Sequence, residues 1–351
     1  MKKPLYIFSI ILIISSLFLA CSHDPFKISI EGIRIDLKFF NLDSALRNSS
    51  DQELLSLKSK FERNKSSILD YNFGYCFGGN MQSDSSYING IRRFYNNDYI
   101  QKLGQTIEKK HGNFNSEKKD LLIAFRRLKA FFPNGKIPSD IYFINSSFSA
   151  SVFCTEKDIA IGIERYLGAD EKVIQELPEQ KFYTWIKNGM KKEYLLRDVI
   201  AGWLMTHYCE ETSENYASEM MRWGKILYIT QATMPNEKIN TILRYTDSQY
   251  NWALNSEGAF WKYLVENELL FKTDQKTRTN LLNEGPFTSG LPNESPDRLG
   301  QFLAWRIVHQ YMANHKISIA ELNKKSYNEL LQNYKAKQDE RKDIKTIRNK
   351  N

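Results

Sequence analysis

All the strand-like patterns of this 351-residue chain lie in its first half, and this uneven distribution restricts the possible folds more than any other feature. From Glu193 onward apolar residues recur at helical spacing and prolines separate the segments, which predicts a succession of helices without a strand. Before that point, short runs rich in Ile, Val and Phe are typical of strands. We therefore predict an α+β fold that is mostly helical, with a small mixed sheet that includes a hairpin.

The strands are predicted at Ile141–Ile144, Ala150–Cys154 and Ile159–Ile163, with a hairpin turn at Glu156, Lys157 and Asp158. Apolar residues also alternate from Ile28 to Leu37 with a slip at Gly32, which predicts a further strand with a bulge. The segment Asp70–Asn80 mixes glycines with aromatic residues and is expected to form a packed loop.

Two helices are predicted before the hairpin, one opening at Asp51 and one running from Asn115 to Pro133. The later helices are predicted at Leu195–Tyr208, Tyr216–Thr233, Glu237–Arg244, Asp247–Leu270, Arg278–Glu284, Asp297–His315 and Ser318–Lys335.

The N-terminus has the pattern of an export signal. Lys2 and Lys3 precede the uncharged run Pro4–Leu19, and Phe18–Cys21 resembles a lipobox, with Phe18 where a Leu-like residue is usual. The sequence thus predicts a lipoprotein signal peptide at 1–20, acylation of Cys21 and a short tether at 21–27. A retained membrane-spanning helix and plain secretion are the alternatives.

Ser22 rather than Asp follows Cys21, which favours the outer membrane, and the lack of an acidic run favours its periplasmic face. Most of the net charge of +8 comes from the leader and from a basic tail at 336–351 that we expect to be disordered. The body, predicted as one domain at 28–335, is close to neutral without a concentrated basic face, which argues against nucleic-acid binding.

Besides Cys21 the sequence has Cys76, Cys154 and Cys209, an odd number at wide spacing. This excludes a disulfide framework and leaves one disulfide possible, with buried free thiols preferred.

The predicted helix Leu195–Tyr208 follows the sheet, where zinc-peptidase-like folds carry H-E-x-x-H, but its one histidine is His207. Glu210 and Glu211 lie close to it in sequence and are the best candidates for further metal ligands. Catalytic zinc needs three protein ligands and a base. The preferred interpretation of His207 is therefore a histidine at the end of a helix, a position that the helix dipole favours. We predict no metal, cofactor or catalytic residue.

Other candidate groups are weaker. His309 and His315 are six residues apart, too far around a helix to share a metal. Cys154 and His207 are a conceivable nucleophile and base, with nothing in their spacing to favour them. The carboxylates at Glu257, Glu266 and Glu268 are expected on a solvated face beside an aromatic core stripe.

Several segments together resemble the gliding-motility lipoproteins of Bacteroidota, the GldB family. They are Gly162–Gly168 (GIERYLG), Gly224–Tyr228 (GKILY), Trp252–Leu270, Gly285–Phe287 (GPF), Ser295–Gly300 (SPDRLG) and Trp305–Met312. Where the family tends to have Glu before the Gly-Lys pair, this sequence has Trp223. Taken singly, Gly224, Pro286 and Gly300 are expected at turns or close contacts, and Trp252, Trp261 and Trp305 in the core.

The resemblance implies a lipoprotein of the gliding and type IX secretion machinery, on a degenerate zinc-peptidase-like scaffold that binds other subunits and lacks catalysis. Two alternatives stay open: a metal-dependent peptidase with an unconventional site, and a periplasmic lipoprotein that captures a small ligand in an aromatic pocket.

Overall fold

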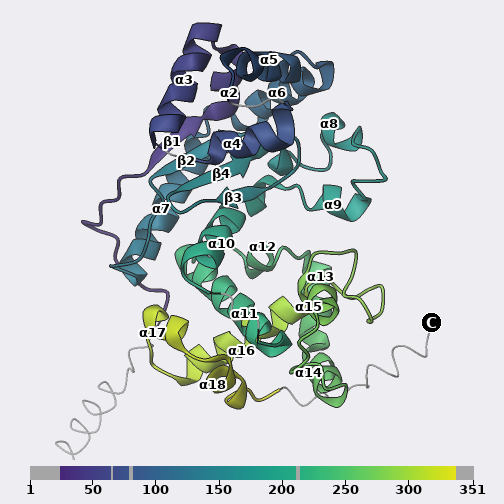
Figure 1. The fold of residues 1–351 in the computed structure, drawn as a ribbon. Coiled ribbons are helices and arrows are strands. Elements are labelled where there is room, and N and C mark those ends of the chain that lie inside the picture. The colour runs from purple at the N-terminus through teal and green to yellow at the C-terminus, as the bar shows by residue number, and fades with distance from the viewer. Residues whose placement is uncertain (1–23, 65, 79–81, 211–213, 337–351) are drawn as a thin grey trace, which may run out of the picture.

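The computed structural model describes residues 24–64, 66–78, 82–210 and 214–336 (Figure 1). The predicted signal peptide, Cys21 and all but the first residue of the predicted tail lie outside the described residues. The α+β prediction is confirmed, since helices predominate and the strands form one mixed sheet. A sheet-bearing half, up to about residue 192, lies above a helical half in Figure 1.

The sheet has four strands in the order β1-β2-β4-β3. They are β1 (Lys38–Asn41), β2 (Asp140–Ile144), β3 (Val152–Cys154) and β4 (Asp158–Gly162). β2 is parallel to both β1 and β4, and β3 pairs antiparallel with β4. The predicted hairpin is therefore confirmed, with strand ends shifted by no more than two residues.

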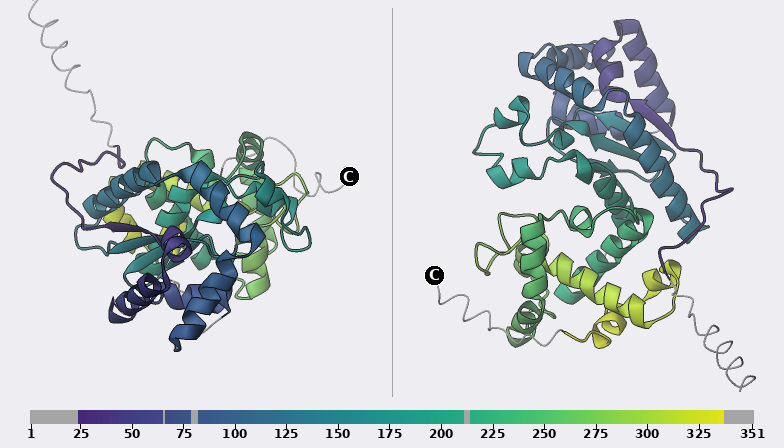
Figure 2. Two further views of the ribbon diagram at one scale, coloured as in Figure 1. Left: turned by 90° about the horizontal axis from the view of Figure 1, so that it is seen from above. Right: turned by 180° about the vertical axis from the view of Figure 1, so that it is seen from behind.

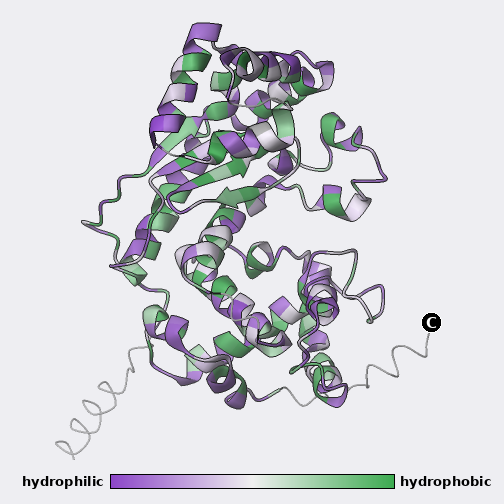
Figure 3. Ribbon diagram, in the orientation of Figure 1, coloured by the Kyte–Doolittle hydropathy of each residue, from purple (hydrophilic) through white to green (hydrophobic). Residues whose placement is uncertain are grey.

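The central strands β2 and β4 are buried, as continuous apolar runs in parallel strands are expected to be. Figure 3 shows this hydrophobic band in the sheet. β4 ends at Gly162, where a Cβ atom would collide with the carbonyl oxygen of Ala150. A glycine is needed there because the connection from β2 to β3 passes so close to the end of the strand.

The predicted strand Ile28–Leu37 is wrong. Its residues run unpaired across the molecule, and Arg126 of α7 (Asn115–Phe131) donates hydrogen bonds to the carbonyl oxygens of Ile30 and Ile33. The apolar residues alternate because one side of this segment packs on the core. The Arg126 guanidinium supplies hydrogen-bond donors to the backbone that a neighbouring strand would otherwise supply. The strand β1 begins only at Lys38.

The predicted loop Asp70–Asn80 is also wrong over most of its described part. Its first residues belong to α4 (Ile68–Asn72), which continues into the π-helical turn η1 (Phe73–Phe77). Tyr71 stacks on Phe153 of β3 with ring centroids 4.3 Å apart, so aromatic packing outweighs the helix-breaking tendency of the glycines. The other helices of this half are α2 (Leu42–Asn48), α3 (Asp51–Asn64), α5 (Asp84–Tyr95), α6 (Asp98–His111), α8 (Lys172–Gln175) and α9 (Thr184–Asn188).

The helical half follows the prediction closely, apart from two helices that are divided. Its elements are the 3₁₀ turn η3 (Lys192–Tyr194), α10 (Leu195–His207), α11 (Tyr216–Thr233), α12 (Ile239–Leu243), α13 (Asp247–Asn255), α14 (Glu257–Glu266), α15 (Gln275–Leu282), α16 (Leu299–Asn314), α17 (Ile319–Lys324) and α18 (Tyr327–Gln332). The predicted helix Asp247–Leu270 is divided at Ser256, and Ser318–Lys335 is divided before Ser326, which caps α18.

α11 and α16 form the most extensive helix pair of this half. Gly224 makes their close approach possible, because a Cβ there would lie 2.6 Å from the carbonyl oxygen of Ala304. At Gly300 a Cβ would lie 2.8 Å from the carbonyl oxygen of Leu281. The expected close-packing roles of both glycines are confirmed. Trp305 is a core residue, whereas Trp252 and Trp261 are only partly buried against the core.

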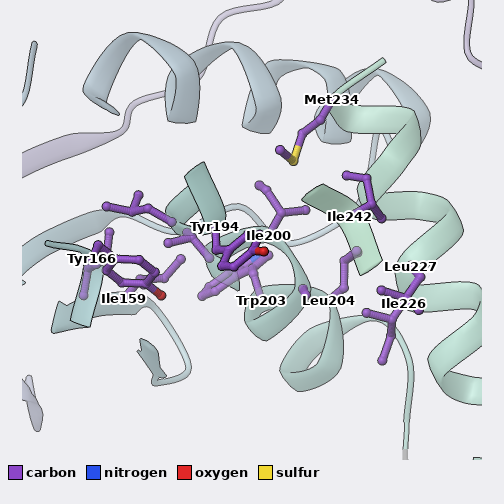
Figure 4. Close-up of a cluster of buried hydrophobic side chains, with 14 of the residues drawn as sticks. Ile159, Tyr166, Tyr194, Ile200, Trp203, Leu204, Ile226, Leu227, Met234 and Ile242 are labelled. Atoms are coloured by element: carbon purple, nitrogen blue, oxygen red, sulfur yellow. The ribbon is translucent and has the colours of Figure 1, made fainter. Parts of the chain in front are cut away.

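One hydrophobic core joins the two halves (Figure 4). Ile159 of β4 and Tyr166 lie at one end of the cluster in Figure 4, and Trp203 and Leu204 of α10 lie between them and Leu227 of α11. α10 therefore acts as the central element that both halves cover. Among the described residues, no helix has the length and apolar character required to cross a membrane.

Candidate functional site

His207, the one histidine that the sequence offers as a candidate metal ligand, connects two elements of the fold. His207 ends α10, and its Nε2 lies 2.9 Å from the carbonyl oxygen of Thr155 at the hairpin turn. Burial lowers the pKa of His207, so the ring is neutral at pH 7. Glu210 is exposed and Glu211 lies outside the described residues. Within the part of the sequence that the structure describes, no group of three His, Cys, Asp or Glu side chains is arranged to hold a metal ion.

The three described cysteines are free thiols. Burial raises the pKa of Cys76, Cys154 and Cys209 to about 12 in each case, which keeps these groups protonated. Cys154 is next to Thr155, the residue that His207 contacts, so the fold does bring this pair into one region. A protonated, largely buried thiol is nevertheless a poor nucleophile.

The remaining sequence candidates serve packing, with one correction. His309 packs near Trp305, and His315 stacks on Tyr311 with ring centroids 4.0 Å apart. Glu266 and Glu268 are exposed as predicted.

The prediction of a solvated position is wrong for Glu257. Its side chain is buried, and it accepts hydrogen bonds from Arg306 Nε at 2.9 Å and from Tyr334 Oη at 3.0 Å. Through these two hydrogen bonds the Glu257 carboxylate connects α14 to α16 and to the residues after α18.

One of the segments that carry the family resemblance contacts a buried carboxylate on α10, that of Asp198. Tyr166, of the segment Gly162–Gly168, donates a hydrogen bond of 3.0 Å to Asp198 Oδ2. Arg244 Nη1 bonds to the same oxygen at 2.5 Å, and Arg197 Nη1 lies 3.2 Å from Asp198 Oδ1. Asp198 thus links the end of the sheet to the turn after α12.

The segments Gly285–Phe287 and Ser295–Gly300 come together beside this cluster. Asp297 accepts a hydrogen bond from the backbone N–H of Gly285 at 3.1 Å and from Arg298 Nη2 at 3.0 Å. Glu284 Oε1 lies 3.6 Å from Arg244 Nη2, which also donates to the carbonyl oxygen of Gly189. The two groups of residues are therefore connected through Arg244.

These contacts surround a pocket of about 310 Å³ at the junction of the two halves. Its wall includes Trp185, Lys191, Tyr194, Arg244, Glu284 and Arg298. The volume falls at the lower end of the range for small-ligand sites, and the wall combines aromatic and charged groups. A pocket of about 430 Å³ also lies near α17 and α18, but residues 210 and 214 line it, on either side of a segment outside the described residues.

The charges at the junction hold one another in their ionised forms. Burial raises the pKa of Asp198, but the nearby charges of Arg244 and Arg197 lower it by more. The resulting pKa is below the ordinary value. Burial lowers the pKa of Arg197 to about 10, which still leaves it cationic at pH 7. Tyr166, whose pKa burial raises, remains a hydrogen-bond donor to the carboxylate.

Sequence reasoning missed this site because its residues are spread between Tyr166 and Arg298 and match no short chemical motif. One available signal was the polar segment Ser295–Gly300 immediately before an apolar helix. The other was a pair of resemblance segments, Gly285–Phe287 and Ser295–Gly300, which both contribute residues to the pocket wall.

The comparison with family models gives one match, to the gliding motility protein GldB, over residues 23–338. No curated protein and no solved structure matches the sequence, so the zinc-peptidase-like scaffold implied by the resemblance gains no support. The match covers nearly all the described residues and includes every segment that forms the pocket. This chain belongs to the GldB family of gliding-motility lipoproteins.

Proposed function

We propose that the protein is a lipid-anchored subunit of the gliding apparatus and its associated type IX secretion machinery, acting through protein contacts without catalysis. The family match over residues 23–338 is the observation that carries this proposal. The lipobox-like segment Phe18–Cys21 supports the anchor, and Ser22 after the cysteine supports the periplasmic face of the outer membrane.

The first described residues support a short connection between anchor and body. The ring of Phe26 lies 5.1 Å from that of Tyr228, and its carbonyl oxygen accepts a hydrogen bond from Arg127 Nη2 at 2.6 Å. Only two residues separate Cys21 from Asp24, a reach of about 10 Å for an extended backbone. Acyl groups on Cys21 would hold this side of the body at the lipid surface.

The pocket lies away from that side. α9, beside the pocket, and α13 lie on the side of the molecule opposite the N-terminal segment in both views of Figure 2. A subunit anchored in this way presents the pocket to the periplasm, where other subunits can reach it.

The states of the histidine and cysteine side chains favour binding over catalysis. His207 is held by Thr155, and the thiol of Cys154 is protonated, so neither supplies an activated group. Elemental analysis of the purified protein tests the peptidase alternative. Stoichiometric zinc that disappears in His207→Ala would contradict a non-catalytic role.

The anchor is tested with Cys21→Ser, which removes the only thiol in the lipobox-like segment. We expect loss of fatty-acid labelling and uncleaved or mislocalised protein, because acylation and cleavage both depend on this thiol. Cys76→Ser is the matched control and should be labelled like the wild type. Labelling that persists in Cys21→Ser contradicts the anchor.

The role in gliding is tested separately by capture of membrane partners on tagged protein and by colony spreading of a deletion strain. We expect gliding or secretion subunits among the captured proteins and a loss of spreading. Normal spreading together with no captured subunit would contradict the proposal.

A further inference from the structure

Arg298 has more hydrogen-bond donors in the pocket wall than the protein satisfies. Its side chain is only 11% exposed, and its one bonded nitrogen is Nη2, which contacts Asp297. Nε is buried without a partner, and the same is true of Nε of Arg244 across the pocket. A desolvated guanidinium with unmet donors costs free energy, so two of them at one pocket indicate a missing acceptor.

The acidic groups nearby are already engaged. Asp198 is bonded by Arg197, Arg244 and Tyr166, and Asp297 is shared between Arg298 and the backbone of Gly285. Neither of these two carboxylates is therefore left to complete Arg298, and Glu284, the other carboxylate of the pocket wall, is exposed and lies 3.6 Å from Arg244 Nη2. An oxyanion from outside, with the planar geometry that a guanidinium binds best, would complete it.

The charge of the wall limits that oxyanion to a single negative charge. Glu284 and Asp297 line the pocket together with Lys191, Arg244 and Arg298. A dianionic phosphate bound at Arg298 would be repelled by the two carboxylates more strongly than a singly charged carboxylate at the same place. The electrostatic environment therefore favours a carboxylate over a phosphate.

The rest of the pocket is too large for a carboxylate alone. Trp185 and the ring of Tyr194 offer aromatic surface, and Tyr183, which is 56% exposed, stacks on Trp185 with ring centroids 6.5 Å apart. The amide of Asn188 is available at the rim for hydrogen bonds to a peptide backbone. These groups can contact one or two amino-acid residues of a ligand that carries the carboxylate.

We propose that this pocket binds the carboxylate of a peptide segment, with Arg298 as the anchoring residue and Trp185 against the neighbouring side chain. The carboxylate belongs either to the C-terminus of a polypeptide or to an acidic side chain. The choice of a peptide rests on the proposed role in protein contacts, whereas the choice of a carboxylate rests on the pocket alone.

Calorimetric titration of the full-length protein in detergent tests the proposal with three peptides of matched composition. One ends in a free carboxylate, one is its C-terminal amide, and one is amidated with an internal Asp. We expect saturable binding of at least one carboxylate-bearing peptide and at least tenfold weaker binding of the neutral amide. The first and third peptides distinguish the two sources of the carboxylate.

Variants of Arg298 connect that binding to the pocket. Arg298→Gln should weaken it at least tenfold, and Arg298→Lys should weaken it less, because the charge remains but the planar fork is lost. Arg34→Gln, at an exposed arginine outside the pocket, is the matched control and should bind like the wild type. Circular dichroism confirms folding, and if Arg298→Gln fails to fold, Arg298→Lys and the neutral peptide still provide the test.

Equal binding of the acid and the amide, unchanged binding in Arg298→Lys, or no binding at millimolar peptide would each overturn the proposal. These results are independent of gliding. A deletion strain that spreads normally would contradict the proposed function and would not alter the titration.

Discussion

The helix pair α11–α16 and the region that follows β4 are stabilised by different kinds of contact. In the helical half, α11 and α16 approach through Gly224 and bury apolar side chains along their length. In the sheet-bearing half, buried carboxylates hold the ends of the elements. Glu164, immediately after β4, is fully buried and accepts hydrogen bonds from the backbone N–H groups of Ser146 and Phe148. Local side-chain spacing therefore indicates the two helices of this pair, whereas the contacts of Glu164 join positions that no local pattern connects.

The largest expected effect tests the close helix packing. Gly224→Leu would place side-chain atoms against the backbone of Ala304, which cannot rotate away. We expect a loss of about 3 kcal/mol in the free energy of unfolding, measured by urea denaturation. Gly202→Ala in α10 is the control, because a Cβ there meets only side chains, at 3.3 Å or more, and we expect a change within about 0.5 kcal/mol. Equal effects at both glycines would contradict the proposed role of Gly224 in the close approach of α11 and α16.

A smaller effect is expected at the end of the sheet. Glu164→Ala leaves the N–H groups of Ser146 and Phe148 without their acceptor, and we expect a loss of about 2 kcal/mol. The effect is limited because burial raises the pKa of Glu164, which shows that the carboxylate itself is costly to bury. Glu164→Gln retains an accepting oxygen and should lose less. If the amide variant is as unstable as the alanine variant, the hydrogen bonds do not account for the effect.

The smallest expected effect concerns a polar contact between the two halves. Glu117 of α7 bonds to His111 Nδ1 and to Lys192 Nζ, each at 2.8 Å, and Lys192 lies in η3 at the start of the helical half. Burial raises the pKa of Glu117, but the bonds from His111 and Lys192 lower it to about 2 overall. Because the folded pKa is depressed, the stabilisation is present above the unfolded value of 4.5 and is lost as the pH falls towards 2.

Glu117→Gln should accordingly lower stability by about 1 kcal/mol at pH 7, and the difference from the wild type should shrink below pH 4.5. Thermal unfolding across this pH range measures it. Glu62→Gln, at an exposed carboxylate of α3, is the control. A difference that is constant with pH would show that the bonds of Glu117 do not depend on its charge.

The same contrast explains what could be predicted from the sequence. α10, α11 and α16 lie within two residues of their predicted ends, because apolar residues at helical spacing are a local signal. The segment Ile28–Leu37 was misassigned since its alternation reflects contact with α7 rather than with a strand, and its bonds to Arg126 join residues more than 90 positions apart.

The pocket could not be predicted for a related reason. Asp198, Arg244 and Arg298 are separated by about fifty residues each and come together only in the tertiary structure of the helical half. Nothing in their local spacing indicates that they will share a site. The segments Gly162–Gly168 and Ser295–Gly300 marked the region, but their side chains come together only through the tertiary structure.

The docking of Phe26 depends on residues that come much later in the chain. Arg127 holds both the carbonyl oxygen of Phe26 and that of Ala232, and the Phe26 ring packs on Tyr228. The segment that contains Phe26 therefore cannot dock until residues about two hundred positions later are available and α11 has formed.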